Sequence, residues 1–245
     1  SGFNGFGLAG VLYALVLIAC LREPAKPAAA AAAQPRALSP WTALKALLGL
    51  GSFLLLMVHF TLPAQSGWLM KNWLPAILAD AFHLAQGKAG INATLWLTFA
   101  SMGGVLAGGA LADRWSRGTA PAGIYTSALG VALMIPALLG VGTSPTLGVA
   151  IGFLLLYGVG WGFFDCNNMP ILCQLVKPEL RATGYGVMNL LSITAGGVFT
   201  SRVGALRDAG VAPFPIFVGV AVAAAASIAL VLCIRPRVAA EAAAD

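Results

Sequence analysis

The sequence predicts an all-α membrane protein with about seven transmembrane helices. Hydrophobic residues make up 59% of its 245 positions and charged residues only 9%, whereas about 25% of the residues of an ordinary soluble domain are charged. Uncharged, mostly apolar runs of roughly 20 residues, the length that a helix needs to cross a bilayer, recur along the chain. Together these observations argue against a water-soluble fold.

Seven segments are apolar and long enough to span a bilayer. In chain order they are residues 1–21, 46–70, 89–112, two helices within 118–164, 182–201 and 209–234. The second segment could extend as one long, kinked helix to about residue 79. The turn sequence Gly-Thr-Ser-Pro at residues 142–145 divides the longest run into two helices.

Composition also divides the chain into parts. Residues 22–41 are rich in Ala and Pro, which predicts a flexible or partly helical linker between two helical bundles. Residues 1–21 would then be the last helix of one bundle, residues 42–234 a second bundle of six helices, and residues 235–245 a cytoplasmic tail. The first apolar run follows neither an initiating Met nor a signal-peptide n-region, so we expect a truncated chain.

The basic residues predict the orientation. In the seven-helix arrangement, the loops on one side and the two flanking segments collect ten of the 14 Lys and Arg residues, and the other side collects four. Because positive residues near span ends are retained in the cytoplasm, the linker and the C-terminus are predicted to be cytoplasmic, in a cell (inner) membrane. The basic residues are scattered between apolar blocks, so nucleic acid is not an expected partner.

Several chemistries lack a matching pattern. The four cysteines lie in apolar stretches without CxxC or Cys/His spacing, which indicates buried thiols and no metal site. Asp165 is the only acid deep in a span, and no Ser/His or Cys/His pair is placed for nucleophilic catalysis. We therefore expect no enzyme activity and no cofactor.

A loop after the third apolar run carries a known signature. Residues 108–118 read GGALADRWSRG, which resembles the Gly-x-x-x-Asp-Arg-x-Gly-Arg-Arg loop of the major facilitator superfamily, in the copy between the second and third helices of its C-terminal half. Gly109 would let a neighbouring helix approach closely, and Asp113 could accept hydrogen bonds from a helix N-terminus or pair with an arginine. Ser116 and Gly118 depart from the strongest form of the signature. The gating-loop residues implied by the resemblance are Gly109, Asp113, Arg114 and Arg117.

Two further stretches resemble the organic-anion and sugar-acid symporter branch of that superfamily. They are NWLP at residues 72–75 and PELRATGYGVMN at residues 178–189. The order and spacing of all three motifs correspond to the sixth through twelfth helices of a twelve-helix transporter, with the first five helices missing. The resemblance implies proton-coupled symport of a small polar organic anion, such as a sugar acid, by alternating access between two halves in the lipid bilayer.

Polar and aromatic residues form helical stripes on three spans, which in the family line the cavity. The stripes are Thr61, Gln65, Trp68 and Asn72; Trp161, Asp165 and Asn168; and Tyr185, Asn189 and Ser192. From them we predict substrate contacts by Gln65, Trp68, Asn72, Trp161, Asn168 and Asn189. An intramembrane carboxylate is costly, so Asp165 is predicted to carry a proton or pair with a cation; the alternative is a structural network with Asn167 and Asn168.

Three other features of the spans are interpreted as structural: a histidine, a lysine and two glycine pairs. His59 is interpreted as a packed polar residue rather than a proton relay, and Lys71 as snorkelling to water, with attraction of anions as the alternative. The GxxxG pairs at residues 104–108 and 158–162 predict close helix packing. The alternative function is a non-transporting receptor or a half-length module that dimerises.

Overall fold

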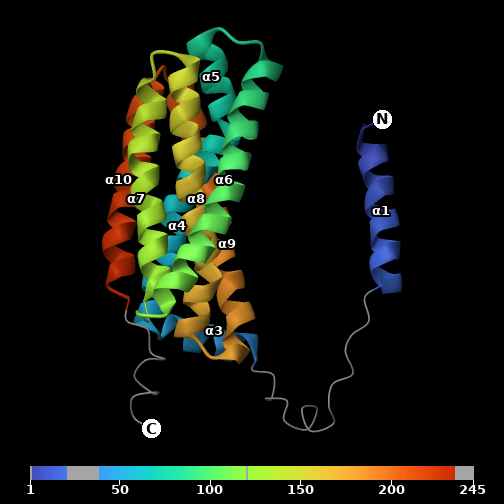
Figure 1. Cartoon of the computed structure of the whole chain (residues 1–245), viewed down its shortest axis with the longest axis vertical. Helices are drawn as coiled ribbons and strands as arrows, with labels where there is room; N and C mark the ends of the chain where they lie inside the picture. Colours follow the sequence, from blue (N-terminus) through green and yellow to red (C-terminus); the bar gives the residue numbers. More distant parts are fainter. Residues whose placement is uncertain (1, 21–38, 120, 235–245) are drawn as a thin grey trace. The chain divides into compact units, whose positions relative to one another are not determined.

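The computed structural model describes residues 2–20, 39–119 and 121–234, and within them it contains nine α-helices and no strand (Figure 1). The chain divides into two units, Ser1–Ala37 and Leu38–Asp245. The first unit holds α1 (Gly2–Cys20), and the second holds all the other helices. Their bounds are α3 (Pro40–Leu48), α4 (Gly51–Asn72), α5 (Leu74–Phe82), α6 (Gln86–Ser116), α7 (Ala122–Thr143), α8 (Leu147–Leu175), α9 (Pro178–Asp208) and α10 (Pro213–Leu232).

The predicted all-α membrane fold is confirmed. Each of the seven predicted spans corresponds to a helix, and five of the described helices are long and apolar enough to cross a membrane: α4, α6, α7, α8 and α10. The strongly apolar part of α1, Gly5–Ile18, is shorter. Helix α9 is long but less apolar, because charged residues occupy both of its ends and a polar stripe runs between them.

The second span differs from its prediction, because one continuous helix to about Ala79 is replaced by α3, α4 and α5. The first break is at Gly49 and Leu50, and the second is at Trp73. Pro75 lies in the first turn of α5, where its missing N–H leaves no hydrogen bond unmade, whereas in a continuous helix it would remove one. Helix α5 ends at Phe82, and the next residue, His83, caps it in the left-handed conformation with φ 51°.

The predicted linker and tail lie mainly outside the described residues. Residues 22–38 and 235–245 are not among them. Pro40 and Trp41, the last two positions of the predicted linker, belong instead to the second unit, where they begin α3. In the second unit, α3 and the α6–α7 and α8–α9 connections lie at one end of the bundle, called here the α3 end (Figure 1). Helix α5 and the α7–α8 and α9–α10 connections lie at the opposite, α5 end.

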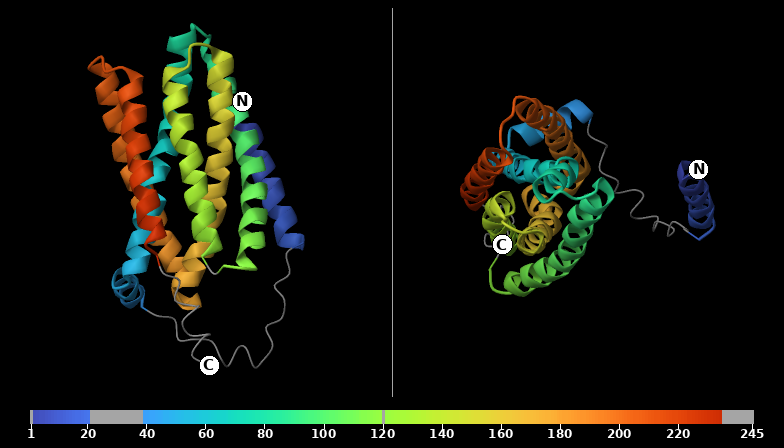
Figure 2. Two further views of the ribbon diagram at one scale, coloured as in Figure 1. Left: turned by 60° about the vertical axis from the view of Figure 1, so that its left-hand side comes forward. Right: turned by 90° about the horizontal axis from the view of Figure 1, so that it is seen from above.

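Helix α8 packs against α6 on one side and α7 on the other, and glycines make both contacts close (Figures 1 and 2). A Cβ added at Gly158 would lie 2.6 Å from the Cβ of Ala100 in α6, and one added at Gly104 would lie 2.5 Å from the carbonyl oxygen of Val159 in α8. The predicted GxxxG packing is thus confirmed. Towards α7, a Cβ on Gly160 would lie 2.6 Å from the carbonyl oxygen of Gly130.

Helix α4 packs against α9 and α10, and a buried histidine ties it to α10 and α7. The Nδ1 atom of His59 lies 3.1 Å from the carbonyl oxygen of Ser227, and Nε2 lies 2.9 Å from the hydroxyl of Ser127. A carbonyl oxygen can only accept, so in the neutral ring Nδ1 carries the proton and Nε2 accepts from Ser127. His59 is fully buried with both nitrogens bonded, as expected for a packed polar residue.

Candidate functional site

A polar hollow of about 200 Å³ lies between α4, α8 and α9. Its polar and aromatic lining residues are Phe60, Trp68, Lys71, Trp161, Phe164, Asp165, Tyr185, Asn189 and Ser192. All three predicted stripes therefore contribute to one concave site, which we call the polar hollow.

The structure places four of the predicted site residues in this hollow: Trp68, Trp161, Asp165 and Asn189. It does not bring Gln65, Asn72 or Asn168 into it. The Gln65 amide donates to the carbonyl oxygen of Thr61 at 2.8 Å, and the exposed Asn72 amide donates to that of Trp68 at 2.9 Å. Asn168 is only 1% exposed, and neither its amide nitrogen nor its amide oxygen has a hydrogen-bond partner among the described residues.

Two glycines seat the two tryptophans of the hollow. A Cβ on Gly67 of α4 would lie 2.5 Å from the indole Cη2 of Trp161, so the ring occupies the place that a side chain would take. In the same way the indole of Trp68 lies directly over Gly196 of α9. Each indole is thereby held against the backbone of a neighbouring helix, which fixes the walls of the hollow.

The hollow contains one acid and one base. Asp165 is exposed at its surface, and Lys71 reaches over Trp161, with its Nζ 5.9 Å from the ring centroid. The alternative structural network is not formed, because the Asn167 amide donates to the Phe163 carbonyl oxygen at 2.8 Å and not to Asp165. Within the described residues neither charge of the hollow has an ion-pair partner within 4 Å.

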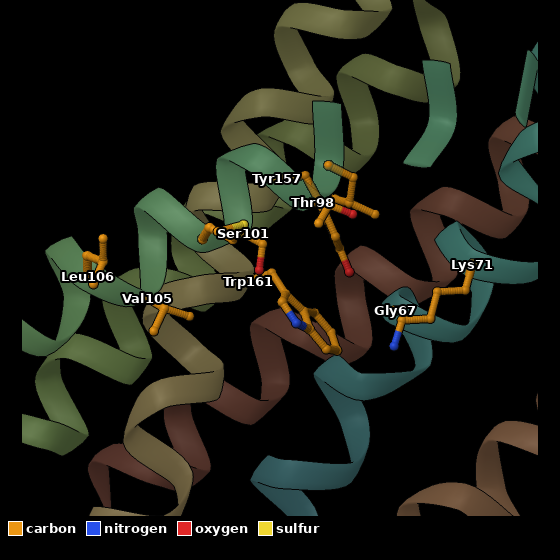
Figure 3. Close-up of a pocket in the computed structure, with 10 residues that line it drawn as sticks. Gly67, Lys71, Thr98, Ser101, Val105, Leu106, Tyr157 and Trp161 are labelled. Carbon is orange, nitrogen blue, oxygen red and sulfur yellow. The ribbon is translucent and has the colours of Figure 1, made fainter. Parts of the chain in front are cut away.

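A larger apolar hollow of about 470 Å³ adjoins the polar one, between α4, α6 and α8 (Figure 3). Gly67, Lys71 and Trp161 line both hollows, so the two meet at the Trp161 ring. The apolar hollow was not predicted from the sequence, because the residues that α6 contributes carry no charge. The signal that could have found it is the pair of hydroxyl residues Thr98 and Ser101 within an apolar span.

The comparison with protein families decides what kind of protein carries this site. The family model described as Major Facilitator Superfamily matches residues 3–201. The chain belongs to the major facilitator superfamily. A comparison with curated proteins gives no match.

Members of the major facilitator superfamily are transporters rather than enzymes, so the protein is a multi-pass membrane protein that moves a solute. Both hollows lie on the α4–α6–α8–α9 face of the bundle, and α7 and α10 contribute no residue to either. Among the described residues no group of three or more His, Cys, Asp or Glu side chains could hold a metal ion.

The signature loop of this superfamily member is arranged differently from the expectation. The close approach expected at Gly109 is found one residue earlier, because a Cβ on Gly108 would lie 2.9 Å from the Cα of Phe163, whereas one on Gly109 would meet nothing within 4 Å. Asp113, Arg114 and Arg117 are exposed at the α3 end and make no ion pair with another described residue. Within this bundle the loop offers its charges to solvent or to an additional partner.

Proposed function

We propose that this transporter is a proton-coupled symporter of small organic anions, for example sugar acids, in which Lys71 holds the anion and Asp165 carries the proton. The observation that supports the proposal is that one ammonium and one carboxylate line the same hollow of about 200 Å³ without forming an ion pair. The aromatic and amide groups of Trp68, Tyr185 and Asn189 in the same hollow suit the remainder of a polar solute.

The two charges suggest how proton and anion would be coupled. At an effective dielectric constant of about 20, opposite unit charges attract by about 4 kcal/mol at 4 Å, and by less at the larger separation of Lys71 and Asp165. An ionised Asp165 therefore weakens the attraction of Lys71 for an anion, and protonation of Asp165 restores it. Since coupling between two binding events is reciprocal, a bound anion equally favours the protonated carboxyl group.

The remaining parts of the proposal concern the rest of the transporter. Alternating access uses two bundles that move against each other around a site at the middle of the membrane. We propose that the face that carries both hollows turns towards a second helical bundle of the same transporter. The positive residues favour a cytoplasmic C-terminus in an inner membrane.

The test uses the protein expressed from its complete reading frame and reconstituted into liposomes that contain a pH-sensitive dye. Sugar acids, dicarboxylates and neutral sugars are added one at a time. We expect at least one anion, and no neutral sugar, to drive proton entry. Asp165→Asn should abolish proton entry but keep anion counterflow, and Lys71→Gln should raise the apparent KM at least about tenfold, as for the loss of a charged hydrogen bond.

Matched controls are Asp208→Asn and Lys88→Gln, which remove a charge of the same kind outside both hollows. The proposal is overturned if no anion moves protons through correctly folded protein. It is also overturned if Lys71→Gln and Lys88→Gln have equal effects on the apparent KM.

A further inference from the structure

The apolar hollow and the polar hollow adjoin each other and differ in their chemistry. On α8, Tyr157, Trp161 and Asp165 follow one another at intervals of four residues, so they occupy successive turns and span about 12 Å along the helix axis. Tyr157 lies in the apolar hollow, Asp165 in the polar hollow, and Trp161 borders both. Lys71 stands at the same border, where Figure 3 shows its side chain reaching towards the Trp161 ring.

The lining of the apolar hollow offers little to a hydroxylated solute. One face of α6 presents aliphatic and thioether side chains to the hollow, those of Leu97, Met102, Val105 and Leu106. The hydroxyl of Tyr157 is already engaged with Ser66 Oγ at 2.6 Å. Ser66 gives its own proton to the Pro63 carbonyl oxygen, so Tyr157 donates to Ser66 and has no hydroxyl proton left to donate to a solute.

Two hydroxyls complete the lining of the apolar hollow. Thr98 and Ser101 have no hydrogen-bond partner among the described residues, unlike Thr61 and Thr126, which bond to the carbonyl four residues earlier. They can orient one polar substituent. They cannot replace the water around a chain of sugar hydroxyls, each of which costs free energy when it is buried without a partner.

We infer that the transported anion is amphipathic: its carboxylate binds Lys71 in the polar hollow, and an apolar group of about the size of a benzene ring enters the apolar hollow against Trp161. This inference rests on the proposed anion transport, and among the small organic anions it favours arylalkyl carboxylates over sugar acids. There is room for such a group, because a cavity of about 150 Å³ is enough to take up benzene, and the apolar hollow measures about 470 Å³.

The test compares two monocarboxylates of equal charge, 3-phenylpropionate and gluconate, in wild-type protein and in Val105→Phe. Val105 lines the apolar hollow only, so a phenylalanine there fills the space of the aryl group without touching the polar hollow. The matched control is Ile91→Phe on an exposed face of the same helix, outside both hollows. Two quantities are measured: proton entry into proteoliposomes, and equilibrium binding of each labelled anion to protein in nanodiscs.

We expect wild-type protein to bind 3-phenylpropionate at least about tenfold more tightly than gluconate, since burial of a phenyl group corresponds to a factor of roughly 10 to 100. Val105→Phe should reduce this ratio at least about tenfold, and Ile91→Phe should leave it unchanged. Equal binding of the two anions, or equal effects of the two variants, overturns the inference. Either result would be expected if a lipid chain occupied the apolar hollow. Binding of 3-phenylpropionate that depends on Val105 but moves no protons would sustain the inference while refuting proton coupling.

Discussion

Replacement of Gly162 by Ala tests a close contact between the backbones of α6 and α8. A Cβ at this position would lie 2.5 Å from both the carbonyl carbon of Gly104 and the carbonyl oxygen of Ser101, and closer still to the backbone nitrogen of Val105. All three are backbone atoms of α6, so no change of side-chain rotamer relieves the clash. The two helices must move apart along their whole contact.

The magnitude follows from comparison with a glycine that has space. Overpacking of this kind costs about 1–3 kcal/mol. A Cβ on Gly152, in the same helix α8, would meet nothing within 4 Å. There Gly→Ala gains about 0.5–1 kcal/mol, because alanine loses less conformational freedom in a helix. The two variants should therefore differ by about 1.5–4 kcal/mol.

Thermal unfolding of the purified protein in detergent, at matched protein and detergent concentrations, measures this difference. At about 2–4 °C per kcal/mol for chains of this size, the unfolding temperature of Gly162→Ala should lie roughly 3–16 °C below that of Gly152→Ala. If Gly162→Ala unfolds at or above the temperature of Gly152→Ala, the backbone contact between α6 and α8 is not made as described.

Two further substitutions test other contacts in the same assay. Ser127→Ala removes the partner of a fully buried His59 nitrogen and should cost about 1–3 kcal/mol, whereas Ser227→Ala should cost less, since His59 bonds the Ser227 backbone carbonyl and not its hydroxyl. Equal destabilisation by the two would contradict this arrangement. Arg207→Gln breaks the 2.5 Å ion pair with Asp80, whose side chain is 69% exposed, so we expect a loss of no more than about 1 kcal/mol; a loss above about 2 kcal/mol would show that Arg207 has a larger structural role.

The helices could be predicted because apolar runs of bilayer length leave little choice of structure. Their ends could not be read from the same signal. The longest run stops before Asp165, but α8 continues to Leu175, since a single charge does not interrupt the helical backbone. The break at Trp73 was missed because tryptophan continues the apolar pattern, and only Pro75 two residues later marks the turn.

The candidate site was predicted in part because helical spacing shows which residues share a face of one helix. It does not show how that face is turned towards its neighbours, or whether a polar side chain bonds to its own helix. Gln65 and Asn72 both donate to the carbonyl four residues earlier and lie outside the hollow. The apolar hollow was missed because its α6 residues carry no charge, and because helical spacing does not show that Gly67 makes room for the Trp161 ring of another helix.

The hydrogen bonds of His59 have a consequence for biogenesis. During synthesis α4 emerges before α7, and α10 emerges last of the described helices. Until then the imidazole stands in the membrane with its N–H unsatisfied, which favours water, a chaperone or the insertion machinery as an interim partner. Docking of α10 supplies the Ser227 carbonyl. A nascent chain that ends before this helix would therefore retain an exposed polar defect, which membrane quality control could recognise.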